Sequence, residues 1–152
     1  MDTVVPMAGE PPVWILVFSK TTKIWWVRLL AFGRYKHVKA FAYVPAMDIY
    51  LFFDWALDRA GVVAAPNTQA TINGYLADFI ADADLMAAPP RSGRRAWPRV
   101  GIFSCVTAIK HLIGLQSRCV APDSLWRDCL AAGGSPLGRP IRITTAVSAA
   151  AA

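Results

Sequence analysis

The sequence has no long uninterrupted apolar stretch, although 55% of its residues are hydrophobic and its mean hydropathy is +0.38. Its main apolar runs, at 13–19, 24–32 and 49–53, are far shorter than the roughly 18 residues that a membrane-spanning helix needs. We therefore expect no membrane span. The first twelve residues lack a basic start and contain acidic side chains and three prolines, so they predict no signal peptide and favour a cytoplasmic location.

Cysteine and histidine are scarce. The three cysteines, Cys105, Cys119 and Cys129, are odd in number and form no CxxC pair, which argues against a disulfide framework and a zinc knuckle and favours reduced thiols. The two histidines, His37 and His111, add no metal-ligand spacing, so we expect no metal site. No P-loop, GxGxxG or GxSxG motif is present, and no cofactor is predicted.

Charged residues make up only 17% of the 152 residues, and the chain contains six Trp and seven Phe, a composition too apolar for disorder to dominate. The net charge of +6 permits an anionic partner without requiring one. Basic side chains are concentrated at 11–47 and 91–118, and acidic ones at 48–90. An exposed loop is the usual setting for arginines in such a basic block, but they could also contact phosphates, so nucleic acid is an unlikely but open partner. These candidate arginines are Arg91, Arg94, Arg95 and Arg99.

The length suits one domain. We expect a flexible arm at 1–12, a single α+β domain at 13–142 and a disordered, alanine-rich tail at 143–152. The domain is predicted to have a central antiparallel β-sheet of about four to six strands, packed against a helix with Cys105 at its N-terminus and at least one other helix. The expected strands lie at 13–18, 24–30, 37–44, 49–55 and 99–103, the helices at 69–84, 104–115 and 122–132, and an exposed loop at 87–97.

A predicted hairpin brings an imidazole and a carboxylate together. The strands at 37–44 and 49–55 are separated only by Pro45–Asp48, so they are expected to pair and to bring position 37 close to position 54 or 55. Asp54 could then accept a hydrogen bond from His37 and set the tautomer of its ring. A slip of one residue in the register would point Asp54 away, and Asp58 is its closest rival.

Cys105 lies at a predicted strand-to-helix junction. Unpaired N–H groups and the positive end of the helix dipole favour a thiolate there and could hold an oxyanion, with Ser104 and Val106 as the flanking residues. A hydrolytic cysteine also needs a base and a group that orients the base, and His37 and Asp54 are the candidates. The alternative is that Cys105 is a small core residue, as Cys119 and Cys129 are expected to be.

Two segments carry a resemblance to a known family. KHVKAFAYVPAMDIYLFFDWAL and FSCVTAIKHLIGLQSRCVAPDSLWRDCLAAGG resemble the histidine-bearing strand pair, the cysteine-bearing helix and a short P-x-x-L helix of the circularly permuted papain-like (NlpC-type) cysteine hydrolases. In this family the histidine strand precedes the nucleophile helix, and phage- and prophage-associated members look most similar. The resemblance covers about residues 25–134, and its most specific piece is C-V-x-x-I-K-x-L-I-G-L. Tyr50 and Ala121 depart from the tryptophan and the capping threonine expected there.

The resemblance implies a nucleophile at Cys105, a base at His37 and a third catalytic member at Asp54. The implied activity is cleavage of an amide, ester or thioester, or acyl transfer, through an acyl-cysteine, with a peptide or another acyl compound as substrate. A virion-associated location and phage structural proteins as partners are then also expected. The alternatives are a catalytically inactive phage structural or assembly protein with a basic face that binds a partner or nucleic acid, and a small protein that oligomerises through an exposed apolar surface.

Overall fold

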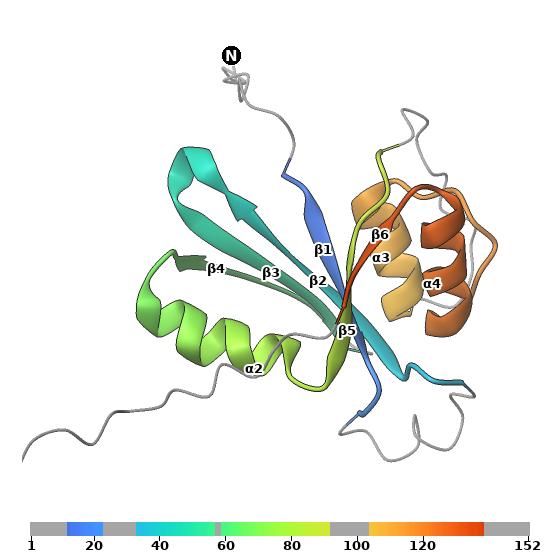
Figure 1. Ribbon diagram of the computed structural model, residues 1–152, viewed down its shortest axis with the longest axis horizontal. Coiled ribbons are helices and arrows are strands. Elements are labelled where there is room, and N and C mark those ends of the chain that lie inside the picture. Colours follow the sequence, from blue (N-terminus) through green and yellow to red (C-terminus); the bar gives the residue numbers. More distant parts are fainter. Residues whose placement is uncertain (1–11, 23–32, 57–58, 92–103, 139–152) are drawn as a thin grey trace, which may run out of the picture.

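The computed structural model describes residues 12–22, 33–56, 59–91 and 104–138. It is an α+β structure built on a six-stranded antiparallel sheet in the order β4-β3-β2-β1-β5-β6, which confirms the expected class and kind of sheet (Figure 1). The strands are β1 (Trp14–Ser19), β2 (His37–Val44), β3 (Ile49–Ala56), β4 (Arg59–Pro66), β5 (Ala83–Ala87) and β6 (Ser135–Gly138). The helical elements are η1 (Pro45–Met47), η2 (Thr71–Leu76), α2 (Ala77–Ile80), α3 (Cys105–Ile113) and α4 (Pro122–Ala131).

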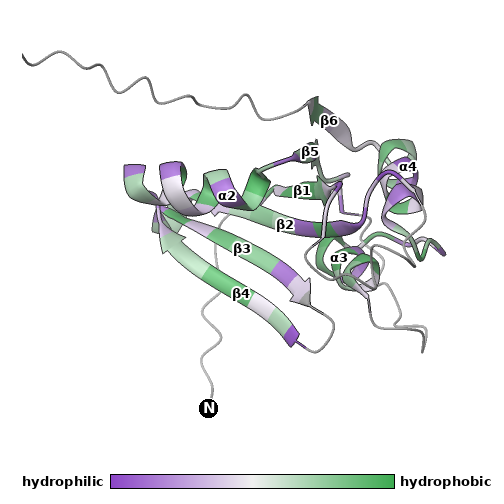
Figure 2. Ribbon diagram, turned by 90° about the horizontal axis from the view of Figure 1, so that it is seen from below, coloured by the Kyte–Doolittle hydropathy of each residue, from purple (hydrophilic) through white to green (hydrophobic). Residues whose placement is uncertain are grey.

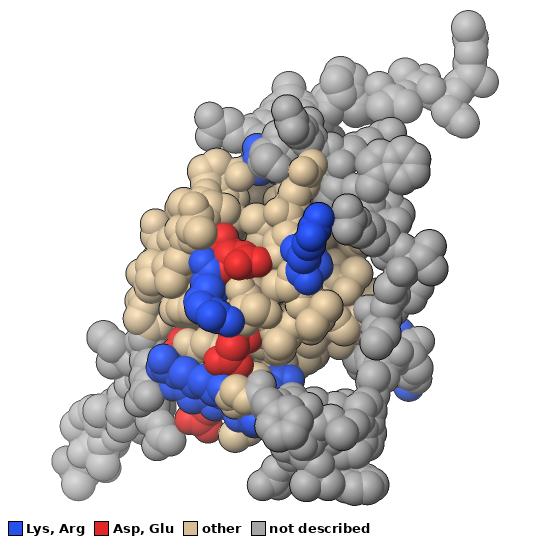
Figure 3. Space-filling view, turned by 90° about the vertical axis from the view of Figure 1, so that its right-hand side faces the viewer, with Lys and Arg blue, Asp and Glu red and all other residues tan. Residues whose placement is uncertain are grey.

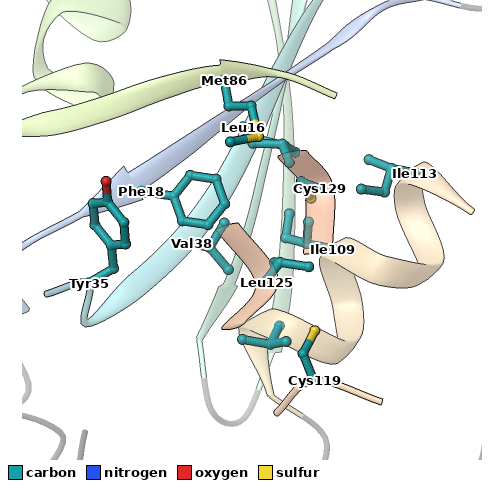
Figure 4. Close-up of a cluster of buried hydrophobic side chains, with 12 residues drawn as sticks. Leu16, Phe18, Tyr35, Val38, Met86, Ile109, Ile113, Cys119, Leu125 and Cys129 are labelled. Atoms are coloured by element: carbon teal, nitrogen blue, oxygen red, sulfur yellow. The ribbon is translucent and has the colours of Figure 1, made fainter. Parts of the chain in front are cut away.

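Helices cover both faces of the sheet, which explains the high apolar content. Successive side chains of a strand point to opposite faces, so the central strands β1 and β2 supply two separate cores. On one face, Leu16, Phe18 and Val38 pack against α3 and α4 (Figure 4). On the other face, Val17 and Phe52 pack against α2. The first core contains Leu16, Phe18, Tyr35, Val38, Ala40, Met86, Val106, Ile109, Ile113, Cys119, Leu125 and Cys129.

The helices α3 and α4 follow their local signals. The Ser104 hydroxyl accepts the backbone N–H of Thr107 at 3.3 Å and caps α3, which ends at Gly114, a residue with φ of 70°. In α4, where the expected capping threonine is replaced by Ala121, the hydroxyl of Ser124 donates to the Ala121 carbonyl at 2.8 Å. Both helices were predicted from the sequence at nearly these bounds.

Several sequence-based assignments were wrong. The helix expected at 69–84 ends at Ile80, because Asp82 turns the chain with φ of 52° and the following residues form β5 beside β1. β5 also takes in Ala87, the first residue of the expected loop. β4 and β6 were not predicted, since most of their side chains are exposed and show no apolar alternation. The strands expected at 24–30 and 99–103, nearly all of the N-terminal arm and the tail lie outside the described residues.

Candidate active site

β2 and β3 part at one end and form a fork. Their cross-strand pairs run from Val44–Ile49 to Ala40–Phe53. Beyond that point β2 stays paired to β1 as far as His37, and β3 stays paired to β4 as far as Ala56. The helix α3 packs against both strands, and Figure 2 shows it beside their separating ends.

His37 and Asp54 lie on the two arms of the fork. The Nε2 atom of His37 is 2.6 Å from Oδ1 of Asp54. Continuing the register from the Ala40–Phe53 pair places His37 as the diagonal neighbour of Asp54 on the same face of the sheet. The side chains are 25% and 48% exposed respectively, so solvent and small reagents reach them. The contact expected from the hairpin is therefore present.

Cys105 is the first residue of α3 and is half-buried. The imidazole of His37 and the backbone N–H groups of Val38 and Val106 lie close enough to its thiol to lower its pKa. Burial alone would raise the pKa of this thiol, but the hydrogen bond and the charge of His37 outweigh burial and lower the pKa below its ordinary value. The structure thus brings together the three residues that the sequence singled out.

The imidazole of His37 is favoured as a cation. Burial of His37 lowers its pKa, but hydrogen bonds to Asp54 and Cys105 outweigh burial and raise the pKa to about 9. Burial likewise raises the pKa of Asp54, and the hydrogen bond from His37 reverses this and lowers it. Because Nε2 is bonded to the carboxylate, Nδ1 is the ring nitrogen that can exchange a proton with the thiol. At neutral pH the imidazole is therefore protonated and Asp54 is ionised, and the lowered pKa of Cys105 shifts its thiol toward the thiolate.

The first turn of α3 can stabilise a second negative charge. The backbone N–H groups of Cys105 and Val106 precede the first intrahelical bond, which runs from Ala108 to the carbonyl of Ser104. The Ser104 hydroxyl is committed to the cap at Thr107, so this side chain shapes the helix end. The side chain of Val106 is buried in the core, and its backbone is its only contribution to the site.

The other cysteines and His111 lie away from the site. Cys119 and Cys129 are buried in the core, and burial raises the pKa of each thiol, to about 12 for Cys129. His111 is exposed in the last turn of α3. Among the described residues, no group of three or more His, Cys, Asp or Glu side chains could hold a metal ion, and no helix is long and apolar enough to cross a membrane.

Among the residues described, basic and acidic side chains are mixed. On the side of the molecule that carries α3 and α4, several Lys and Arg side chains border Asp side chains (Figure 3). Lys20 and Arg34 both pair with the buried Asp84, at 3.0 and 2.6 Å. Arg91 is exposed and lies against Gly114. Arg94, Arg95, Arg99 and the rival carboxylate Asp58 lie outside the described residues.

Sequence reasoning missed two neighbours of the site. Val38 lies beyond the last β2–β3 pair, and its backbone N–H lowers the pKa of the thiol; no sequence signal marks such a donor. Lys39 lies two residues after His37, on the same face of β2, and its charge lowers the pKa of Asp54. Alternation along the strand could have identified it. Tyr50, at the expected tryptophan position, packs against Tyr43 with ring centroids 5.2 Å apart.

Comparison with known proteins assigns no relative to this chain. No protein-family model, no curated protein and no solved structure matches it. The residues of the fork and the first turn of α3 are therefore the basis for interpreting the site.

Proposed function

We propose that the protein is a cysteine hydrolase or acyltransferase of the permuted papain-like type, of phage or prophage origin. It would cleave an amide, ester or thioester through an acyl intermediate on Cys105. One observation carries the proposal: a single imidazole, that of His37, is 2.6 Å from the carboxylate of Asp54 and lies beside the thiol at the first position of a helix, where it lowers the pKa of that thiol. A thiol, a base and an orienting acid in this order are the parts that nucleophilic catalysis by cysteine needs.

The reaction would begin with the Cys105 thiolate. Its sulfur attacks the carbonyl carbon of the substrate, and the π electrons of the carbonyl move to oxygen. The backbone N–H groups at the start of α3 stabilise this oxyanion. When the carbonyl re-forms, the amine, alcohol or thiol leaves with the proton that the His37 imidazolium donates, and the acyl group remains on sulfur.

Release of the acyl group uses the same imidazole as a base. Neutral His37 takes a proton from water, and the resulting hydroxide attacks the thioester carbon. Collapse of the second tetrahedral intermediate expels the Cys105 thiolate and yields the carboxylic acid, with His37 again protonated. An amine or alcohol in place of water would make the same step an acyl transfer. Asp54 stabilises the imidazolium in both halves of the cycle.

The order of the elements supports the permuted papain-like assignment. The histidine strand β2 precedes the nucleophile helix α3 in the chain, and the short helix α4 begins at the proline of the P-x-x-L motif. The six-stranded sheet packs against α3 through Val106 and Ile109. These features agree with the arrangement that the resemblance implies.

The test combines labelling and turnover. Native protein is treated with iodoacetamide at pH 7, and the alkylated cysteine is identified by peptide mass mapping. Cys105 should react at least about tenfold faster than Cys119 and Cys129, because only its pKa is lowered. A panel of chromogenic esters, thioesters and anilides should be turned over by the native protein but not by Cys105→Ser. Equally slow labelling of all three cysteines, together with no difference in turnover, would overturn the proposal.

A further inference from the structure

Strand pairing of β2 does not by itself fix the position of His37. The pair Ser19–His37 is the last of the β1–β2 ladder, and on the opposite side the β2–β3 pairs have already ended at Ala40. One more backbone bond, from the Lys36 N–H to the Ser19 carbonyl at 2.9 Å, continues this edge. The placement of the imidazole therefore depends on what holds the residues just before it.

Those residues are held by a carboxylate from another element. Asp123, in the first turn of α4, accepts the backbone N–H of Arg34 on Oδ1 at 3.0 Å and that of Tyr35 on Oδ2 at 3.1 Å. Gly33 makes this approach possible, because a Cβ at that position would collide with Oδ2 of Asp123. Its φ of 119° is also one that residues with side chains rarely adopt. Both carboxylate oxygens are thus used on consecutive amides.

Tyr35 provides a second attachment of the same segment. Its ring is buried, with centroids 5.2 Å from those of both Phe18 and Trp126, and Trp126 belongs to α4. Its hydroxyl donates to the buried carboxylate of Asp84 at 2.8 Å. The segment that precedes His37 is therefore fixed to α4 at its backbone and to β5 at the end of a side chain.

The same helix also supports the thiol. Leu125 of α4 is fully buried in one core with Val106 and Ile109 of α3. In addition, the ammonium of Lys110 on α3 donates to the carbonyls of Ser117 and Cys119 at 3.1 and 2.7 Å, which fixes the connection between the two helices. α4 is accordingly the common support of the helix that carries Cys105 and of the chain that leads into His37.

We propose that Asp123 is a positioning residue for the imidazole–thiolate pair: its two bonds to the amides of residues 34 and 35 hold His37 within reach of Cys105. The catalytic meaning of this role rests on the proposed function. The role itself concerns a distance between two groups, and it can be measured without a substrate. Asp123 touches neither the reacting sulfur nor the ring, and it acts through the backbone that precedes His37.

The test uses Asp123→Ala, which removes both acceptors, and Asp123→Asn, which turns one oxygen into a donor facing a donor. The readout is the pH dependence of Cys105 alkylation by iodoacetamide, followed by peptide mapping, with the ultraviolet absorbance of the thiolate as a second measure. In both variants the apparent pKa of Cys105 should rise toward the ordinary value of about 8.5, and the alkylation rate at pH 7 should fall about tenfold. Asp123→Asn should show the smaller effect.

Asp128→Asn is the matched control. Asp128 lies on the same helix and is bonded to the hydroxyl of Ser117 rather than to the segment before His37. This variant should loosen α4 without changing the pH profile of Cys105. An equal change in Asp128→Asn and Asp123→Asn would show that any weakening of α4 suffices and would overturn the positioning role.

The remaining outcomes separate this inference from the proposed function. If Cys105 is selectively reactive in the native protein and the folded Asp123 variants keep its pH profile, the positioning role is overturned and the proposed function stands. If Cys105 shows no selective reactivity in the native protein, the proposed function is overturned, and the positioning role is overturned with it. If Asp123→Ala does not fold, Gly33→Ala provides a second test, because its Cβ would collide with Oδ2 of Asp123 and disturb the bonds to the amides of residues 34 and 35. This variant should raise the apparent pKa of Cys105 as Asp123→Asn does. An unchanged profile in Gly33→Ala would count against the role.

Discussion

His37 and Asp54 are 17 residues apart and are joined by a bond of 2.6 Å between Nε2 and Oδ1. The relationship follows from the register of β2 and β3, because a shift by one residue would carry the carboxylate to the opposite face of the sheet. The base and the group that orients it thus belong to one hairpin. The nucleophile reaches the hairpin from a helix much later in the chain.

Asp54→Asn should weaken the imidazole as a base and reduce the fraction of its protonated form, which donates to the leaving group. The carboxylate opposes the effect of burial on His37, so its loss should lower the pKa of the ring and cost about ten- to a hundredfold in turnover. Turnover of the most reactive ester in the chromogenic panel provides the measurement. Asp48→Asn, which alters an exposed carboxylate bonded to Tyr43 in the hairpin turn, is the control and should retain full activity. Equal losses in the two variants would contradict a specific role for Asp54.

Turnover and alkylation should depend differently on pH. The lowered pKa of Cys105 means that alkylation should rise with pH below the range of an ordinary thiol and then stay level. Turnover should rise in parallel and then fall as pH passes about 9, because His37 loses the proton that it gives to the leaving group. Parallel rate profiles from pH 5 to pH 10 test this. A Cys105 that titrates like a free thiol would refute it.

Asp84→Ala should destabilise the fold. Asp84 is 6% exposed and accepts bonds from Lys20, Arg34 and Tyr35, so its removal leaves a buried hydroxyl and two cations without their acceptor. Because both cations are partly exposed, we expect a loss of about 2–3 kcal/mol in the free energy of unfolding, measured by urea denaturation. Asp78→Ala, at an exposed position of α2, should change stability by less than about 0.5 kcal/mol. A similar loss in both variants would argue against the buried network.

The same network predicts the effect of acid. Burial raises the pKa of Asp84, but bonds from Tyr35 and Lys20 outweigh it, and the pKa in the folded protein lies below the ordinary value. The stabilisation is therefore present at neutral pH and is lost as pH falls below about 4 toward the lowered pKa. The difference in unfolding free energy between the native protein and Asp84→Ala should shrink over that range. A difference that stays constant with pH would contradict the assignment.

Leu125→Ala should cost about 3 kcal/mol, because this side chain is fully buried between α4 and the sheet and its removal leaves a cavity. Leu130 lies on the same helix but is 39% exposed, and Leu130→Ala should cost less than about 1 kcal/mol. Urea denaturation of both variants gives the comparison. Equal costs would mean that α4 does not pack against the sheet as described.

The parts of the site that the sequence predicted are those with local signals. The hairpin follows from two apolar strands on either side of Pro45–Asp48, and this proximity predicts the contact between His37 and Asp54. The start of α3 follows from a serine cap, and its end from a glycine in the left-handed region. Each signal lies within a few residues of the structure that it specifies.

Where local signals are weak, the sequence predicted the wrong element or no element. Residues 83 and 84 were assigned to the helix expected at 69–84, yet they begin β5 because β1 offers them an unpaired edge. β4 is rich in alanine and mostly exposed, so nothing in its composition marked it as a strand. The two hydrogen bonds that the carboxylate of Asp123 accepts from the amides of residues 34 and 35 join segments 89 and 88 positions apart. A glycine followed by an arginine predicts no such partner.

The sequence by itself therefore determined the residue types of the site, the hairpin that joins the imidazole to the carboxylate, and the capped helix that begins at the thiol. Only the tertiary structure decided that this helix meets the fork between β2 and β3, and that α4 supports both the helix that carries Cys105 and the segment that precedes His37. The reason is physical: turns and caps are specified by neighbouring residues, whereas helix docking depends on the apolar surface that the whole sheet presents and on which strand edges remain unpaired.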